Sequence, residues 1–107
     1  MSIAEGLDHV GVATADLDAA AAEWERLGFA LTPLARHAPP AGTANRCAML
    51  RHGYVELIAV VDAQKPSATL DRFLARHAGI HILSLATGDE HQASGYRMLG
   101  EGQVAPS

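Results

Sequence analysis

The sequence is poor in the residues that mark several classes of protein. Cys47 is the one cysteine among 107 residues, which excludes an internal disulfide framework and fits a reducing compartment. The eight basic residues, seven of them arginine, form no basic run, so a nucleic-acid partner is not expected. No apolar run approaches the roughly 18 residues of a membrane span, and the first residues do not resemble a signal peptide. We therefore expect a cytoplasmic protein without a membrane partner.

The remaining composition is typical of a globular domain. Hydrophobic residues make up 49% of the chain and charged residues 19%, with a net charge of −4; these proportions exclude a disordered or fibrous chain. The length suffices for one domain with a single core. No low-complexity tract or block of charge divides the sequence, so we predict one domain over residues 1–107.

The apolar pattern predicts an α+β fold. Alternating apolar and β-branched residues indicate strands, whereas apolar residues at three- and four-residue steps indicate helices. Gly28 is placed to end the first helix, because glycine is favoured just after a helix C-terminus. In chain order the expected elements are strand 7–14, helix 17–27, strand 30–34, strand 44–50, strand 54–61, helix 69–77, strand 80–87 and helix 88–99.

The region of the first strand recurs near the C-terminus. Residues 6–14 (GLDHVGVAT) align without a gap with residues 79–87 (GIHILSLAT), and one residue of slip then places Leu27-Gly28 on Leu99-Gly100. A repeat of this kind indicates a duplicated supersecondary unit that buries its apolar face against its copy. The alternative is that any two strand–helix units share such features.

Five short motifs follow one another at characteristic spacings. They are LDHVGV at 7–12, DLDAA at 16–20, LGF at 27–29, GTANR at 42–46 and GYVEL at 53–57. In these motifs the chain resembles the vicinal oxygen chelate superfamily of glyoxalases, bleomycin resistance proteins and dioxygenases, and within it the glyoxalase-like domains. The resemblance implies a complete βαβββ module over residues 6–61. Residues 62–107 would then hold a linking helix and the strand and helix that open a second, truncated module.

The resemblance also implies how such modules work. Two of them pair so that their sheets curve around a divalent metal ion, which holds two neighbouring oxygens of a small-molecule substrate. Only about half of a second module remains from Gly79 onward, so we expect either a truncated chain or two chains that complete each other as a homodimer. Metal ligands in the family come from the first and fourth strands of each module.

His9 and Glu56 match those two ligand positions. Strand parity places both side chains on one face of the sheet, and a carboxylate within an apolar strand is costly to bury unless it is paired or bound to a metal. The alternatives are that His9 is an ordinary polar residue on a half-solvated face and that Glu56 pairs with Arg46. Glu56 is also the expected catalytic carboxylate.

A third metal ligand is less well defined. The position that matches His9 in the second module is Ile82. Because a shift of one residue reverses the face of a strand side chain, His81 would take that role only if its strand were bulged or the alignment were off by one residue. Two ligands alone would hold a metal weakly, since stable sites take three or more.

Three further residues are expected to bind the substrate: Asn45, Arg46 and Tyr54. Arg46 could pair with a substrate carboxylate or phosphate, although a solvated or Glu-paired arginine fits the pattern as well. His37 and His52 lie near expected loops and are interpreted as surface residues.

Three classes of function are compatible with these patterns. The first is a metal-dependent lyase, isomerase or dioxygenase acting on a small oxygen-rich substrate, in which the metal stabilises an enolate or alkoxide and a carboxylate moves the proton. The second is a metal-free small-molecule binding protein of the drug-sequestering type. The third is an inactive, truncated paralogue that only folds and dimerises.

Overall fold

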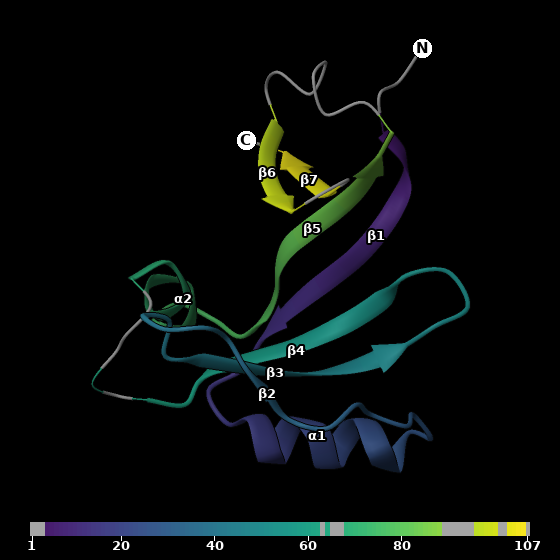
Figure 1. The fold of residues 1–107 in the computed structure, drawn as a ribbon. Coiled ribbons are helices and arrows are strands. Elements are labelled where there is room, and N and C mark those ends of the chain that lie inside the picture. The colour runs from purple at the N-terminus through teal and green to yellow at the C-terminus, as the bar shows by residue number, and fades with distance from the viewer. Residues whose placement is uncertain (1–3, 63, 65–67, 89–95, 101–102, 107) are drawn as a thin grey trace.

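The structure is a computed structural model of the chain. It describes residues 4–62, 64, 68–88, 96–100 and 103–106, and Figure 1 shows their arrangement. The elements are β1 (Ala4–Ala13), α1 (Leu17–Arg26), β2 (Ala35–Arg36), β3 (Thr43–Met49), β4 (Tyr54–Val60), α2 (Ala68–Leu74), β5 (Gly79–Thr87), β6 (Tyr96–Gly100) and β7 (Gln103–Pro106). The strands form one sheet in the order β2-β3-β4-β1-β5-β7-β6. None of the helices in the described part of the chain has the length and apolar character to cross a membrane.

The first half of the chain forms the predicted βαβββ arrangement. β4 pairs with β1 in parallel and with β3 in antiparallel register, and α1 crosses between β1 and the remaining strands. The Asp16 carboxylate accepts a hydrogen bond from the Ala19 N–H at 3.1 Å and thereby caps α1. Gly28 follows the helix with a φ of 102°, a conformation that L side chains rarely adopt. The predicted α+β fold class is therefore confirmed.

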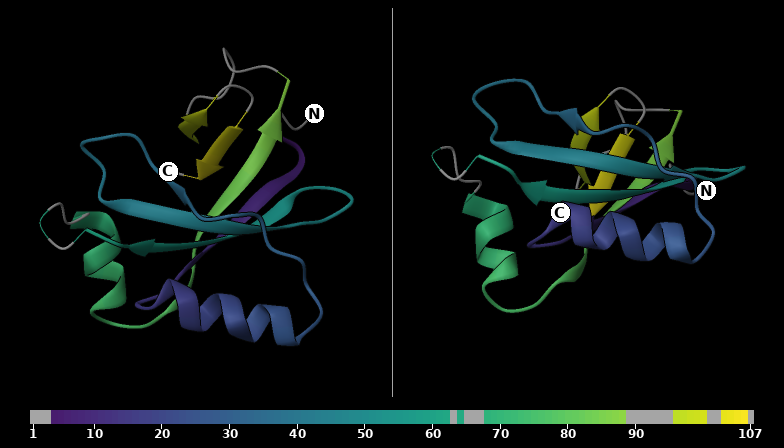
Figure 2. Two further views of the ribbon diagram at one scale, coloured as in Figure 1. Left: turned by 60° about the horizontal axis from the view of Figure 1, so that its bottom comes forward. Right: turned by 90° about the horizontal axis from the view of Figure 1, so that it is seen from below.

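The core lies between α1 and one face of this sheet (Figure 2). Leu57 on β4 is fully buried and belongs to a cluster with Leu17 of α1 and Ala44 of β3. Val12 and Val55 pack against the same cluster. Because strand side chains alternate, the residues between them face the other side of the sheet. That opposite face carries the polar residues of interest.

The second strand differs from the expectation of residues 30–34. Leu31 forms only an isolated bridge with Ala48, and the ladder with β3 resumes at Ala35–Arg36. Pro33 lies between these two points. Proline has no N–H to donate to a ladder, which explains why the pairing is interrupted there.

The second half of the chain extends the sheet past β1. β5 pairs with β1 in antiparallel register, and β7 and β6 continue beyond it. The helix expected over residues 88–99 is wrong where it can be compared, because Tyr96–Gly100 is a strand; residues 89–95 lie outside the described residues. The end of this segment resembles the end of α1 in sequence, but an unpaired strand edge recruits further strands. Pairing along the open edge of β5 therefore decides its conformation.

Candidate functional site

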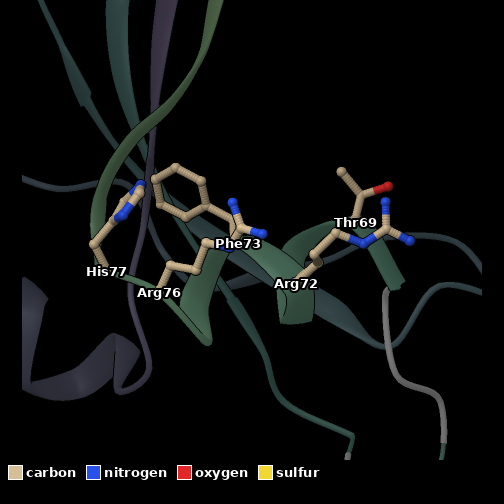
Figure 3. A pocket seen from close by; sticks show the side chains of 5 residues that line it. All are labelled: Thr69, Arg72, Phe73, Arg76 and His77. Atoms are coloured by element: carbon tan, nitrogen blue, oxygen red, sulfur yellow. The ribbon is translucent and has the colours of Figure 1, made fainter.

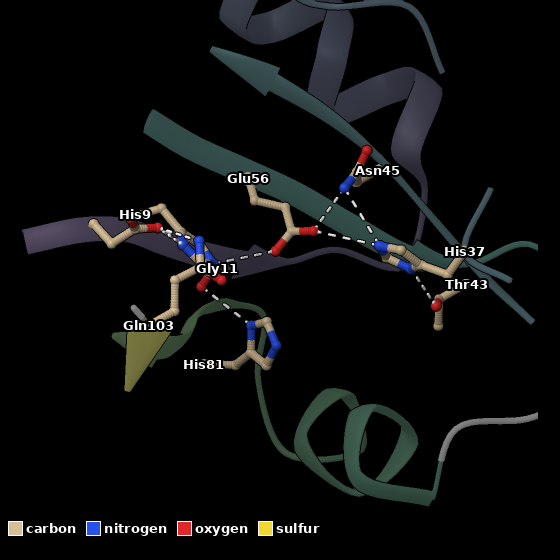
Figure 4. Close-up of polar contacts among 9 residues, drawn as sticks. His9, Gly11, His37, Thr43, Asn45, Glu56, His81 and Gln103 are labelled. Atoms are coloured by element: carbon tan, nitrogen blue, oxygen red, sulfur yellow. Dashed lines mark hydrogen bonds and ion pairs between the residues drawn. The ribbon is translucent and has the colours of Figure 1, made fainter. Parts of the chain in front are cut away.

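A pocket of about 410 Å³ opens on the side of the sheet that faces away from α1. Its residues come from β1, the β2–β3 region, β4, β5 and β7, and Figure 4 shows most of them. The pocket is lined by His9, His37, Asn45, Tyr54, Glu56, Ile58, His81, Ile82 and Gln103.

Glu56 lies at the centre of this pocket, between two imidazoles (Figure 4). Its side chain is 14% exposed; Oε1 is 3.7 Å from His9 Nε2, and Oε2 is 3.6 Å from His37 Nε2. Asn45 donates a hydrogen bond to Oε2 at 2.7 Å. The prediction that His9 and Glu56 share one face is confirmed. The alternative that Glu56 pairs with Arg46 is wrong.

Asp8 is turned toward His9 by an irregularity in β1. The register between β1 and β5 shifts by one residue between Leu7 and His9, and a bulge of this kind re-aims side chains. The Asp8 carboxylate consequently accepts a hydrogen bond from His9 Nδ1 at 2.8 Å. Because a carboxylate only accepts, this contact assigns the proton of a neutral His9 ring to Nδ1. The unprotonated Nε2 then faces Glu56.

Further contacts hold the Asp8–His9 pair in place. Gln103 of β7 donates to the same Asp8 oxygen at 2.7 Å. The Tyr54 ring stacks on the His9 ring with centroids 4.5 Å apart and planes 6° from parallel. Burial raises the pKa of the Tyr54 hydroxyl, and the Asp8 carboxylate raises it further. Tyr54 therefore stays protonated near neutral pH and remains a hydrogen-bond donor.

Like Asp8 and Gln103, His37 belongs to the site although the sequence did not reveal it. It was interpreted as a surface residue, yet its Nδ1 lies 2.7 Å from Thr43 Oγ1 and its Nε2 lies 3.4 Å from the Asn45 amide nitrogen. An amide nitrogen only donates, so this contact assigns the proton of a neutral His37 ring to Nδ1, as in His9. The available signal was the alternation of Thr43 and Asn45 on β3, because the β2–β3 register pairs His37 with Thr43 and Ala35 with Asn45.

His81 enters the pocket because β5 is bulged. Gly11 pairs with Ile82 and Val12 pairs with Ile80, which leaves His81 as the extra residue. Its Nδ1 lies 3.1 Å from the Gly11 carbonyl oxygen. A Cβ atom on Gly11 would come within 2.8 Å of His81 Cε1, so the glycine leaves room for the imidazole. The sequence admits His81 as a third metal ligand only under conditions that include a bulge in its strand, and that bulge is present.

A divalent metal would find two suitable donors here. His9 Nε2 and Glu56 Oε1 face each other, and Asp8 holds the other ring nitrogen of His9, as the outer partners of metal-binding histidines do. Within the described residues, however, no group of three or more His, Cys, Asp or Glu side chains is arranged to hold a metal ion. The donor set in this part of the chain fits a metal only in part.

Arg46 is not among the residues that line the pocket. It lies on the other face of β3, where its Nε donates to the Thr32 carbonyl at 2.9 Å and its Nη1 is 3.5 Å from Glu25 Oε1. Its expected contact with a substrate stays a prediction without support from this placement.

Cys47 lies beside Glu56 in the β3–β4 register. Burial raises the pKa of its thiol, and the charge of Glu56 raises it further.

Comparison with known families identifies the class of this protein. The family model described as "Glyoxalase-like domain" matches residues 7–104. The chain therefore belongs to the glyoxalase-like domain family, as the motifs predicted. No curated protein matches the chain significantly.

Solved structures agree with this assignment. The chain is similar to methylmalonyl-CoA epimerase from Mycobacterium tuberculosis, with 28% identity and a TM-score of 0.67, over 94% of this chain and 71% of that one. It is also similar to a hypothetical protein from Bacillus halodurans, with 21% identity and a TM-score of 0.66, over 92% and 80%. A variant of methylmalonyl-CoA epimerase from Streptomyces coelicolor, in complex with 2-nitronate-propionyl-CoA, has 17% identity and a TM-score of 0.62, over 95% and 86%. The last two support the fold alone.

Proposed function

We propose that this chain catalyses proton transfer at a carbon atom next to a carbonyl group of a small oxygen-rich substrate, which is an isomerase activity. The observation that carries the proposal is the Glu56 carboxylate, which lies in a pocket and is flanked on both sides by imidazole nitrogens. A positioned carboxylate with a histidine beside it is a common arrangement for general acid–base catalysis.

The two oxygens of Glu56 are suited to different tasks. Oε2 is held by Asn45 at 2.7 Å, which leaves Oε1 to accept a proton from the substrate. His9 Nε2, 3.7 Å from Oε1, is unprotonated in the assigned tautomer and can receive that proton. Asp8 stabilises the resulting imidazolium through Nδ1. The protonated Tyr54 hydroxyl is available to donate to the developing oxyanion.

A divalent metal ion is an alternative form of the proposal, because it would use the same two atoms, His9 Nε2 and Glu56 Oε1, that otherwise accept the proton. His9 and Glu56 would hold it, and when bound it would supply a Lewis acid for the substrate oxygen. With two protein ligands the ion would bind weakly, and His81 or a partner chain would have to complete the site. Metal titration by calorimetry on the native protein and on Glu56→Ala tests this alternative. Identical isotherms for the two proteins would remove Glu56 from the metal site.

Similarity to an epimerase favours an isomerase over a lyase or a dioxygenase. The Mycobacterium tuberculosis protein acts, by its name, on a coenzyme A ester, so acyl thioesters belong in the first set of substrates to be tested. A metal-free binding protein is the second candidate function. An aromatic-lined cleft would favour it, but Tyr54 is the sole Phe, Tyr or Trp side chain among the described lining residues, and its ring already stacks on His9.

Hydrogen–deuterium exchange separates these candidates. The protein would be incubated in D₂O with small carbonyl compounds and acyl thioesters, including methylmalonyl-CoA, and the substrate C–H signal followed by proton NMR. We expect the native protein to exchange one of them and Glu56→Gln to be slower by about 100-fold or more. Glu25→Gln, which removes an exposed carboxylate on α1, is the matched control. Equal rates for Glu56→Gln and the native protein would reject Glu56 as the base, whereas binding without exchange would favour the second candidate.

The expected homodimer also remains a proposal. Leu7 on β1 and Ile80 and Leu83 on β5 are large apolar side chains that lie exposed on neighbouring strands, and exposed apolar patches often mark interfaces. Light scattering at micromolar concentration tests it. A monomer that unfolds cooperatively would contradict the proposal.

A further inference from the structure

A second cavity, of about 300 Å³, lies beside α2 and is distinct from the Glu56 pocket in its residues and its charge. We call it the α2 cavity; Figure 3 shows its side chains. It is lined by Thr69, Arg72, Phe73, Arg76 and His77. Thr69, Arg72 and Arg76 follow one another at three- and four-residue steps, which places them on one side of a helical segment. In Figure 3 the Arg72 guanidinium lies beside Thr69, and the Arg76 guanidinium lies beside Phe73.

The two arginines of the α2 cavity differ from others in the chain. Arg26 lies 3.3 Å from a Glu23 oxygen, and Arg46 lies 3.5 Å from a Glu25 oxygen. In the part of the chain that the structure describes, no carboxylate lies within ion-pair distance of Arg72 or Arg76. Among the described residues these two positive charges therefore have no carboxylate partner, and in a chain with a net charge of −4 they form a local site for an anion.

The chemistry of these side chains favours a phosphate group over a carboxylate. A guanidinium group presents a planar fork of donors that matches two oxygens of either group, so the number of oxygens decides. A phosphate has enough oxygens to engage both arginines and the Thr69 hydroxyl at once. The Phe73 ring provides an apolar wall, and the His77 ring contacts it edge-on with centroids 4.4 Å apart.

Phe73 also connects the α2 cavity with the Glu56 pocket. Its ring centroid lies 5.8 Å from that of His81, and His81 lines the Glu56 pocket. One elongated molecule could therefore place its ends in both cavities. We propose that the α2 cavity binds the phosphate-bearing end of the substrate, while the reacting end lies at Glu56. The second of these two placements rests on the proposed function.

Binding of inorganic pyrophosphate and of free coenzyme A, measured by calorimetry at low ionic strength, tests the inference without any reaction. We expect both probes to bind the native protein, and Arg72→Gln and Arg76→Gln each to weaken binding by about tenfold. Arg51→Gln is the matched control, because it removes an exposed positive charge from the turn between β3 and β4. We expect it to bind like the native protein. Tighter binding of coenzyme A than of pyrophosphate would identify a phosphorylated carrier, and equal binding a free phosphate ester; both results support the inference.

Two results would overturn the inference. One is that the native protein binds neither probe. The other is that Arg51→Gln weakens binding as much as Arg72→Gln and Arg76→Gln do, because the loss of affinity would then come from net charge alone. Glu56→Gln separates this inference from the proposed function, since it should slow proton exchange by about 100-fold or more and leave pyrophosphate binding unchanged. If the native protein binds pyrophosphate but catalyses no proton exchange on any substrate tested, the proposed function is rejected and the phosphate site is still supported.

Discussion

Replacing Gly53 by alanine should destabilise the protein and disturb the candidate site together. Gly53 lies in the turn before β4 with a φ of 87°, and an added Cβ atom would come within 2.6 Å of the Asp8 carbonyl oxygen. The left-handed conformation costs an L residue about 1–2 kcal/mol. The contact is with backbone, so β1 would have to move, and overpacking of this kind adds about 1–3 kcal/mol. We therefore expect Gly53→Ala to lose about 2–5 kcal/mol of unfolding free energy.

Gly28→Ala is the matched control for this prediction. Gly28 has a φ of 102°, but a Cβ atom there would meet nothing within 4 Å. It should therefore lose only the conformational part, about 1–2 kcal/mol. Urea unfolding measures both variants, and amide chemical shifts of Asp8 and His9 report on β1. A Gly53→Ala variant no less stable than Gly28→Ala, with unchanged shifts at Asp8 and His9, would refute the reasoning.

Three other predictions concern buried residues. Leu57→Ala should lose about 2–5 kcal/mol in urea unfolding, because Leu57 is fully buried in the core under α1; a loss below 1 kcal/mol would argue against that packing. Ser84→Ala should change stability by less than about 1 kcal/mol or raise it, because the buried Ser84 Oγ has no hydrogen-bond partner among the described residues; a large loss would reveal a partner. Iodoacetamide should alkylate Cys47 slowly until the protein unfolds, because the raised pKa keeps the buried thiol protonated near neutral pH; rapid labelling of the folded protein would be inconsistent with this environment.

The period-2 alternation of strands made the centre of the site predictable. His9 and Glu56 fall on one face because each strand sends alternate side chains to opposite sides, and the motifs identified which strands are neighbours. The same alternation places Leu57 on the opposite face, where it packs under α1.

Irregular backbone accounts for what the sequence did not predict. The bulges at Asp8 and His81 are set by pairing between β1 and β5, which joins residues far apart in the chain. His37 reaches Glu56 because the ladder between β2 and β3 resumes after Pro33. The strand at Tyr96–Gly100 was expected to be helical because its Leu-Gly end resembles that of α1, and its pairing with β7 decides otherwise.

Nitrogen-15 NMR of the histidine rings tests the central claim most directly, because it needs neither substrate nor metal. The account requires that His9 and His37 both turn an unprotonated Nε2 atom toward the Glu56 carboxylate. At a pH where the rings are neutral, we expect both to be Nδ1–H tautomers, and Asp8→Asn to change the tautomer balance of His9 while leaving His37 as it was. An Nε2–H tautomer for His9 in the native protein would contradict the account, because Glu56 would then face a donor that cannot accept its proton.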